Sequence, residues 1–186
     1  EPYRRQRQMC IRDRCHKKSM VIRKIPEYLR FSHKDLVESD YAPESIINLL
    51  ENSVTAHLSI VVGGQPHAGK TELVKYLSTK IPHNEKAGVY EDNQEIHYRK
   101  INPNKKCVEF FVDDKVTYQD IIKAGLRHNI DWILLSESRG PEVAHLLNSL
   151  STGSYCMTTM HLDEVRDMPD SCLLYTSPSP RDRSLS

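Results

Sequence analysis

The stretch that decides the fold is Gly64-Gln-Pro-His-Ala-Gly69-Lys70-Thr71. It fits the pattern G-x-x-x-x-G-K-[ST] of a phosphate-binding (Walker A) loop without a gap. Glycine is needed where the chain turns tightly or lies against phosphate oxygens, so that successive backbone N–H groups can surround the phosphate. In this pattern Lys70 reaches the β- and γ-phosphates of a nucleotide, and the Thr71 hydroxyl binds Mg²⁺. The loop therefore predicts a site for ATP and Mg²⁺.

The sequence on either side of the loop supports this interpretation. Residues 57–62 form a short apolar, β-branched run, as in a buried parallel strand, and residues 72–80 carry apolar side chains at helical spacing. The alternative is a strand–turn–helix corner that contains Lys-Thr by coincidence. The loop interior is also less common than a Gly/Ser-rich one. We expect nucleotide contacts from Gly64, Gln65, Pro66, His67, Ala68, Gly69, Lys70, Thr71 and Glu72.

Strand-like and helix-like segments alternate over the rest of the chain, which predicts an α/β domain with a largely parallel sheet flanked by helices. Besides 57–62, we expect strands at 20–23, 88–90, 107–112, 132–136 and 155–159. We expect helices at 32–39, 42–54, 72–80, 118–128 and 141–150.

Two groups of acidic residues follow expected strands. Glu137 comes directly after 132–136, where a carboxylate could act as general base on a water molecule. Its alternative is a surface acid at a strand end. Glu91 opens an acidic group over 91–95, for which an ordinary solvated turn is an equal alternative.

Two basic side chains are also candidates for the same site. Arg139 lies two residues after Glu137 and could pair with a carboxylate or contact phosphate. His161 follows the expected strand 155–159, and ligands of open α/β sheets bind at the carboxyl ends of strands. A structural histidine is the alternative. We therefore predict Glu137, Glu91, Arg139 and His161 as catalytic residues.

The charge of the chain is uneven. Residues 1–18 hold seven Lys/Arg and two acidic residues, whereas residues 19–170 hold 17 Lys/Arg and 22 acidic residues. A basic arm that binds nucleic acid is one interpretation. However, residues 5–13 and 172–183 each resemble a translated sequencing adaptor, so we expect 1–18 to be a non-native or disordered arm and 171–186 a non-native, disordered tail. No apolar run approaches the roughly 20 residues that cross a bilayer.

Taken in order, four motifs resemble the secretion ATPase superfamily of type II and type IV secretion and type IV pili, most closely its tight-adherence (CpaF-type) branch. Residues 64–71 match its Walker A loop, and 89–95 match its Asp box. Residues 134–140 match its atypical Walker B motif, and 157–161 match its His box. Ser136 departs from the family, which usually has glycine before the Walker B glutamate.

The resemblance implies a RecA-like P-loop core that hydrolyses ATP as a cytoplasmic homo-hexamer. Such a motor powers secretion or pilus assembly, meets the membrane only peripherally through an inner-membrane platform protein, and binds no nucleic acid directly. It also implies that residues 19–42 are the remnant of an N-terminal domain and linker, with Arg23 approaching the nucleotide. Residues 43–170 would be a partial RecA-like ATPase domain. We expect the chain to be an inactive fragment of an active parent.

Two other functions stay open. A P-loop nucleotide-binding or regulatory module would share the loop but have no motor role. A RecA-like DNA-handling ATPase would need a basic track outside the two ends, and the excess of acidic residues over 19–170 argues against one.

Overall fold

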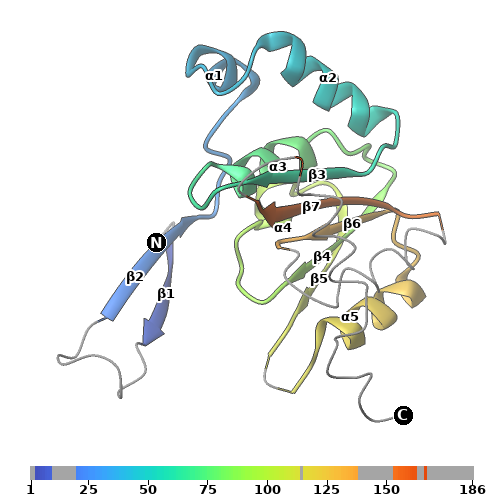
Figure 1. The fold of residues 1–186 in the computed structure, drawn as a ribbon. Coiled ribbons are helices and arrows are strands. Elements are labelled where there is room, and N and C mark those ends of the chain that lie inside the picture. Colours follow the sequence, from blue (N-terminus) through green and yellow to red (C-terminus); the bar gives the residue numbers. More distant parts are fainter. Residues whose placement is uncertain (1–2, 10–19, 114, 138–152, 163–165, 167–186) are drawn as a thin grey trace.

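The structure is a computed structural model of residues 1–186, and it describes residues 3–9, 20–113, 115–137, 153–162 and 166. The first two strands, β1 (Tyr3–Met9) and β2 (Met20–Pro26), pair antiparallel as a two-stranded ribbon. Figure 1 shows this ribbon projecting from the rest of the domain. Residues 1–18 were expected to be a non-native or disordered arm, with no strand named there, whereas β1 lies within them. Backbone pairing with β2 does not require an alternating apolar pattern.

The domain is built on a five-stranded sheet with the order β3-β7-β6-β4-β5, in which every pair is parallel. Its strands are β3 (Ile60–Gly64), β4 (Lys86–Glu91), β5 (Lys106–Phe111), β6 (Trp132–Leu135) and β7 (Tyr155–His161). The prediction of a largely parallel α/β sheet is confirmed, and each strand lies within a few residues of its expected position.

Helices connect and cover these strands. They are α1 (His33–Glu38), α2 (Glu44–Thr55), α3 (Lys70–Ser78), α4 (Tyr98–Ile101), α5 (Tyr118–Gly125) and the 3₁₀ turn η1 (Leu126–His128). The short helix α4 was not predicted, because four residues show no helical periodicity. The expected helix 141–150 lies outside the described residues. None of the described helices is both long and apolar enough to cross a membrane.

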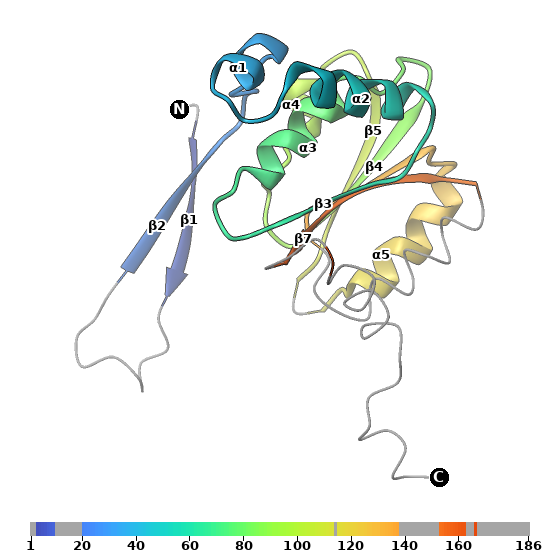
Figure 2. The ribbon, with the colours of Figure 1, turned by 45° about the horizontal axis from the view of Figure 1, so that its top comes forward.

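The sheet separates two apolar cores (Figure 2). On the side of α2 and α3, Ile47, Leu77, Leu134 and Met157 are fully buried. On the side of α5, Ile121 and Ile122 pack against Leu135 and neighbouring side chains. Because side chains alternate between the faces of a strand, even-numbered residues of β6 face α3 and odd-numbered ones face α5.

Parallel pairing places the carboxyl ends of the strands at one edge of the sheet. Gly64 lies opposite His161 in the register of β3 and β7. The ends of β4 and β6 lie beside them, because β6 pairs with both β4 and β7. The fold therefore gathers the predicted motifs at one edge, although they are spread over almost a hundred residues of sequence.

Candidate active site

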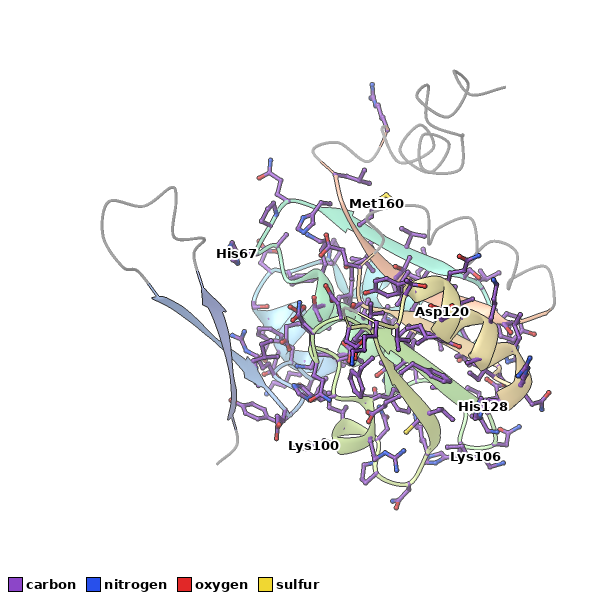
Figure 3. The ribbon with its side chains drawn as sticks, turned by 90° about the horizontal axis from the view of Figure 1, so that it is seen from below. His67, Lys100, Lys106, Asp120, His128 and Met160 are labelled. Carbon is purple, nitrogen blue, oxygen red and sulfur yellow. The ribbon has the colours of Figure 1, made fainter. Side chains whose placement is uncertain are left out.

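The loop between β3 and α3 adopts a curled backbone that depends on three residues with positive φ. These are Gly64 (φ 154°), His67 (φ 66°) and Gly69 (φ 84°). Glycine takes such angles without penalty, and histidine is one of the side chains that tolerate the left-handed region. His67 is exposed at the margin of the domain (Figure 3). The unusual loop interior is therefore compatible with the turn, because histidine stands where a left-handed residue is needed.

Helix α3 begins at Lys70, and its first N–H groups are oriented toward the loop. The N–H of Leu73 donates to the Gly69 carbonyl. In the part of the chain that the structure describes, the N–H groups of Lys70, Thr71 and Glu72 have no backbone acceptor of this kind, as expected for the first turn of a helix. Such N–H groups, together with the helix dipole, favour an anion at this position. The loop thus fits a phosphate group.

Lys70 is buried and folds back over the loop. Its Nζ donates to the carbonyl oxygens of Gly64 and Gln65, each at 2.8 Å. Burial lowers the pKa of the ammonium group, and the negative charge of Glu137 opposes that shift. A phosphate at the mouth of the loop would offer this cation a charged partner in place of two neutral carbonyls.

His161 joins Lys70 to Glu137. Lys70 Nζ lies 3.2 Å from His161 Nδ1, and His161 Nε2 lies 3.0 Å from Glu137 Oε1. Because an ammonium group can only donate, Nδ1 is the acceptor of the Lys70 hydrogen bond, which leaves Nε2 to carry the ring proton beside the carboxylate. Three residues that the sequence predicted separately thus lie in one chain of close polar contacts.

Thr71 and Glu95 form the second polar pair of the site. The Thr71 hydroxyl donates to Glu95 Oε2 at 3.3 Å. No group of three or more His, Cys, Asp or Glu side chains within the described residues has the arrangement of a preformed metal site.

Glu91 does not line the loop cavity. It is 2% exposed, and its Oε1 accepts the backbone N–H groups of Glu95 and Ile96 at 3.0 and 2.8 Å. Burial is the main reason that the pKa of this carboxyl rises to about 7. Glu91 therefore holds the segment that presents Glu95 to Thr71, and its side chain faces a neighbouring pocket. Glu95 was named only as part of the acidic group, because its distance from the strand gave no sign that it would turn back toward the loop.

A cavity of about 500 Å³ lies above these groups. Its lining includes most of the predicted nucleotide contacts, together with Glu137 and His161. The full set is Ile25, Pro26, Arg30, Pro66, His67, Ala68, Gly69, Lys70, Thr71, Glu72, Asp92, Asn93, Glu95, Ser136, Glu137, Thr159 and His161. Gly64 and Gln65 contribute through the carbonyls that hold Lys70. Arg139 lies outside the described residues, and the structure describes only the backbone of Arg23, within β2.

The end of β2 forms one wall of the cavity. Lys75 of α3 is fully buried, and its Nζ donates to the Pro26 carbonyl at 2.9 Å and lies 3.2 Å from Glu72 Oε1. This contact ties the segment after β2 to the helix that follows the loop, and it brings Arg30 to the cavity. The sequence contained no signal for Arg30, because its approach depends on a buried lysine in a distant element.

Ser136 and Thr159 form the floor of the cavity. Both are buried, and the Thr159 hydroxyl donates to the Ser136 carbonyl at 2.6 Å. The Ser136 Oγ is buried and has no hydrogen-bond partner among the described residues. This position is the one at which the sequence departs from the motif it otherwise matches.

The fold and this cavity define a P-loop nucleoside-triphosphatase core. Residues 13–170 match the family model described as "Type II/IV secretion system protein", so the chain belongs to that family. It is 28% identical over 141 residues to the type IV secretion system protein VirB11 of Bartonella quintana, an alignment that covers 71% of this chain and 39% of that protein.

Solved structures agree on the fold. The VirB11 ATPase of the Brucella suis type IV secretion system, in complex with sulphate, superposes with a TM-score of 0.67 at 20% identity over 98% of this chain and 60% of that one. The pilus retraction motor PilT with bound ADP superposes with a TM-score of 0.63 at 15% identity, over 87% of this chain and 46% of that one. The chain spans only 29% to 39% of the length of the first curated relatives it matches.

Proposed function

We propose that this chain is the nucleotide-binding core of an ATP-hydrolysing motor subunit that powers type II or type IV secretion or pilus assembly. The observation that carries the proposal is the chain of close polar contacts from Lys70 through His161 to Glu137 at the rim of the loop cavity. A candidate phosphate-binding cation and a candidate base thus lie on either side of one histidine, which supports hydrolysis of a terminal phosphate at this site. Family membership supports the same reaction class.

In the proposed reaction, ATP binds with its phosphates against the loop N–H groups and Lys70. The Thr71 hydroxyl would hold Mg²⁺, which would supply neutralisation of phosphate charge. Glu137 takes a proton from a water molecule, whose oxygen attacks the γ-phosphorus. The bond from that phosphorus to the β–γ bridging oxygen then breaks, and its electron pair leaves with ADP.

The remaining residues have supporting parts. His161 orients the Glu137 carboxylate through its Nε2–H, and Glu91 positions the segment that carries Glu95. We assign Arg139 to phosphate or carboxylate contact, and Arg23 to the approach of the linker to nucleotide, both from the family motifs. Arg30 lines the cavity and is a further candidate for phosphate contact.

We further propose that the active form is a homo-hexamer of a longer parent protein, closest to the tight-adherence branch. It would work in the cytoplasm at the inner face of the membrane, on a platform protein. Family membership, the length of the relatives and the four ordered motifs support this assembly.

Equilibrium binding of a fluorescent ATP analogue to the chain tests the proposal. The unsubstituted chain should bind the analogue in the presence of Mg²⁺. Lys70→Ala should weaken this binding at least tenfold, because loss of one charge-assisted phosphate contact costs about 1.5–3 kcal/mol. In the longer parent protein, Glu137→Gln should retain binding and lose hydrolysis. Normal turnover by that variant would show that the base is wrongly assigned.

A further inference from the structure

The Ser136 hydroxyl is one of four buried side-chain polar atoms among the described residues that have no hydrogen-bond partner; the others are Glu72 Oε2, His97 Nε2 and Tyr98 OH. Ser136 is 6% exposed and lines the cavity, yet its Oγ has no hydrogen-bond partner within the described part of the chain. Leaving a buried hydroxyl unpaired costs about 1–3 kcal/mol. Its backbone, by contrast, is paired on both sides, to Tyr90 and to Thr159. The backbone therefore holds the side chain in place, although its hydroxyl has no partner in the part of the chain that the structure describes.

The position of Ser136 in the fold indicates which partner it lacks. It follows the four apolar residues of β6 directly, on the face that Leu134 directs toward α3. In P-loop nucleoside triphosphatases Mg²⁺ is held jointly by the loop Ser/Thr and an acid at the end of a neighbouring apolar strand. In this chain the strand-end position holds a serine. The acid comes one residue later, and its carboxylate contacts His161.

We infer that the Ser136 hydroxyl belongs to the Mg²⁺ side of the nucleotide site, where it pairs with a water molecule of the ion's hydration shell. This rests on the proposed function of the loop. In the proposed site the Thr71 hydroxyl is already the direct protein ligand of the ion, so we assign Ser136 to the water shell around it. Mg²⁺ keeps several of its waters when it binds protein, and a water bound to a cation is a strong donor to a hydroxyl oxygen.

The inference predicts opposite effects of one substitution in two states. Without nucleotide, Ser136→Ala removes an unpaired buried hydroxyl, so the chain should become more resistant to urea. With nucleotide, the same variant loses a hydrogen bond that forms only when the hydrated ion is bound. A hydroxyl with a purely structural role would not separate the two states in this way.

The experiment measures binding of a fluorescent ATP analogue to the full chain, once with Mg²⁺ and once with EDTA. Ser136→Ala should weaken binding about fivefold with Mg²⁺, the value of one net hydrogen bond, and leave binding in EDTA unchanged. Ser136→Gly, which restores the residue typical of the family, should behave in the same way and guards against an effect of the alanine methyl group.

Ser78→Ala is the matched control. Ser78 is also a fully buried serine, but its hydroxyl donates to the Lys75 carbonyl at 2.7 Å and does not line the cavity. This variant should lose stability and keep the full effect of Mg²⁺ on binding. If Mg²⁺ strengthens binding of the analogue to both Ser136 variants as much as it does for the unsubstituted chain, the inference is wrong while the proposed function stands. If the unsubstituted chain binds no nucleotide, or if Lys70→Ala binds it equally well, the proposed function fails and this inference fails with it.

Discussion

The Nζ of Lys70 lies 3.2 Å from the Nδ1 of His161, although the two residues are 91 positions apart in the chain. Lys70 begins α3 and His161 ends β7, so neither element brings the other close by itself. The contact exists because β3 and β7 pair in parallel with Gly64 opposite His161. The same histidine reaches Glu137 through its other nitrogen. One strand register thus couples the phosphate-binding cation to the candidate base.

Replacing His161 should separate catalysis from binding. In the longer parent protein, His161→Ala should lower kcat by about 10²-fold, because Glu137 loses the donor that orients it. KM should change little, since Lys70 keeps its loop contacts. His161→Gln, which retains both a donor and an acceptor, should recover part of the rate. Steady-state hydrolysis measures both constants, and a large rise in KM with unchanged kcat would contradict the positioning role.

Glu91 should make folding stability depend on pH. The pKa of its carboxyl is raised from 4.5 to about 7 in the folded chain, so the folded state holds the proton more tightly than the unfolded state. Stability from this group is therefore fully present below pH 4.5, falls as the pH rises toward 7, and stays low above that. The shift corresponds to about 3 kcal/mol.

Glu91→Gln cannot titrate, and so it isolates this contribution. The unfolding free energy of Glu91→Gln minus that of the unsubstituted chain should rise from pH 4.5 to 7.5. Urea unfolding can be followed through the fluorescence of Trp132, the single tryptophan, which is fully buried in β6. A difference that does not vary with pH would show that Glu91 titrates normally in the folded chain.

Gly69→Ala should damage the loop for two reasons. Gly69 has a φ of 84°, and a Cβ there would lie 3.2 Å from Cε2 of the Tyr41 ring. A left-handed L-residue costs about 1–2 kcal/mol, so the unfolding free energy should fall by at least that amount. Tyr41→Leu in the same background should relieve the contact but not the backbone strain. Urea midpoints for the single and double variants separate the two causes, and an unchanged midpoint for Gly69→Ala would refute both.

Gly125→Ala should destabilise the core on the α5 side through a clash with the Tyr90 ring and hydroxyl. A Cβ at Gly125 would lie 1.9 Å from the hydroxyl oxygen of Tyr90. Overpacking of this kind typically costs about 1–3 kcal/mol. Tyr90→Phe removes that oxygen, so it should recover part of the loss when combined with Gly125→Ala. Additive effects in this double-mutant cycle would mean that Tyr90 is not the obstacle.

Much of the sheet could be predicted because its signals are local. The run before Gly64 is apolar and β-branched, and the glycines and Lys70-Thr71 that follow allow one main interpretation. β4, β5, β6 and β7 were predicted in the same way, and each was found within a few residues. The ribbon strand β1 and the short helix α4 carry no such local signal. They form through pairing with β2 and through the packing of a four-residue turn.

The residues of the candidate site also separate into those with a local sequence signal and those without one. Lys70, Thr71, Glu137 and His161 stand in motifs whose spacing indicates their chemistry. The position of Glu91 outside the cavity could not be predicted from motif spacing. It depends on a carboxylate turning to accept N–H groups from its own loop, and on Glu95 then reaching Thr71.

By itself the sequence determined the phosphate loop, the alternation of strands and helices, and the residues able to act on a phosphate. These follow from backbone freedom, apolar periodicity and side-chain chemistry, which are properties of neighbouring residues. Only the tertiary structure decided that Lys70, His161 and Glu137 share one chain of close polar contacts, and that the Ser136 hydroxyl is buried with no partner among the described residues. Those facts depend on strand register and burial, because distances between residues far apart in sequence are set when the parallel sheet assembles.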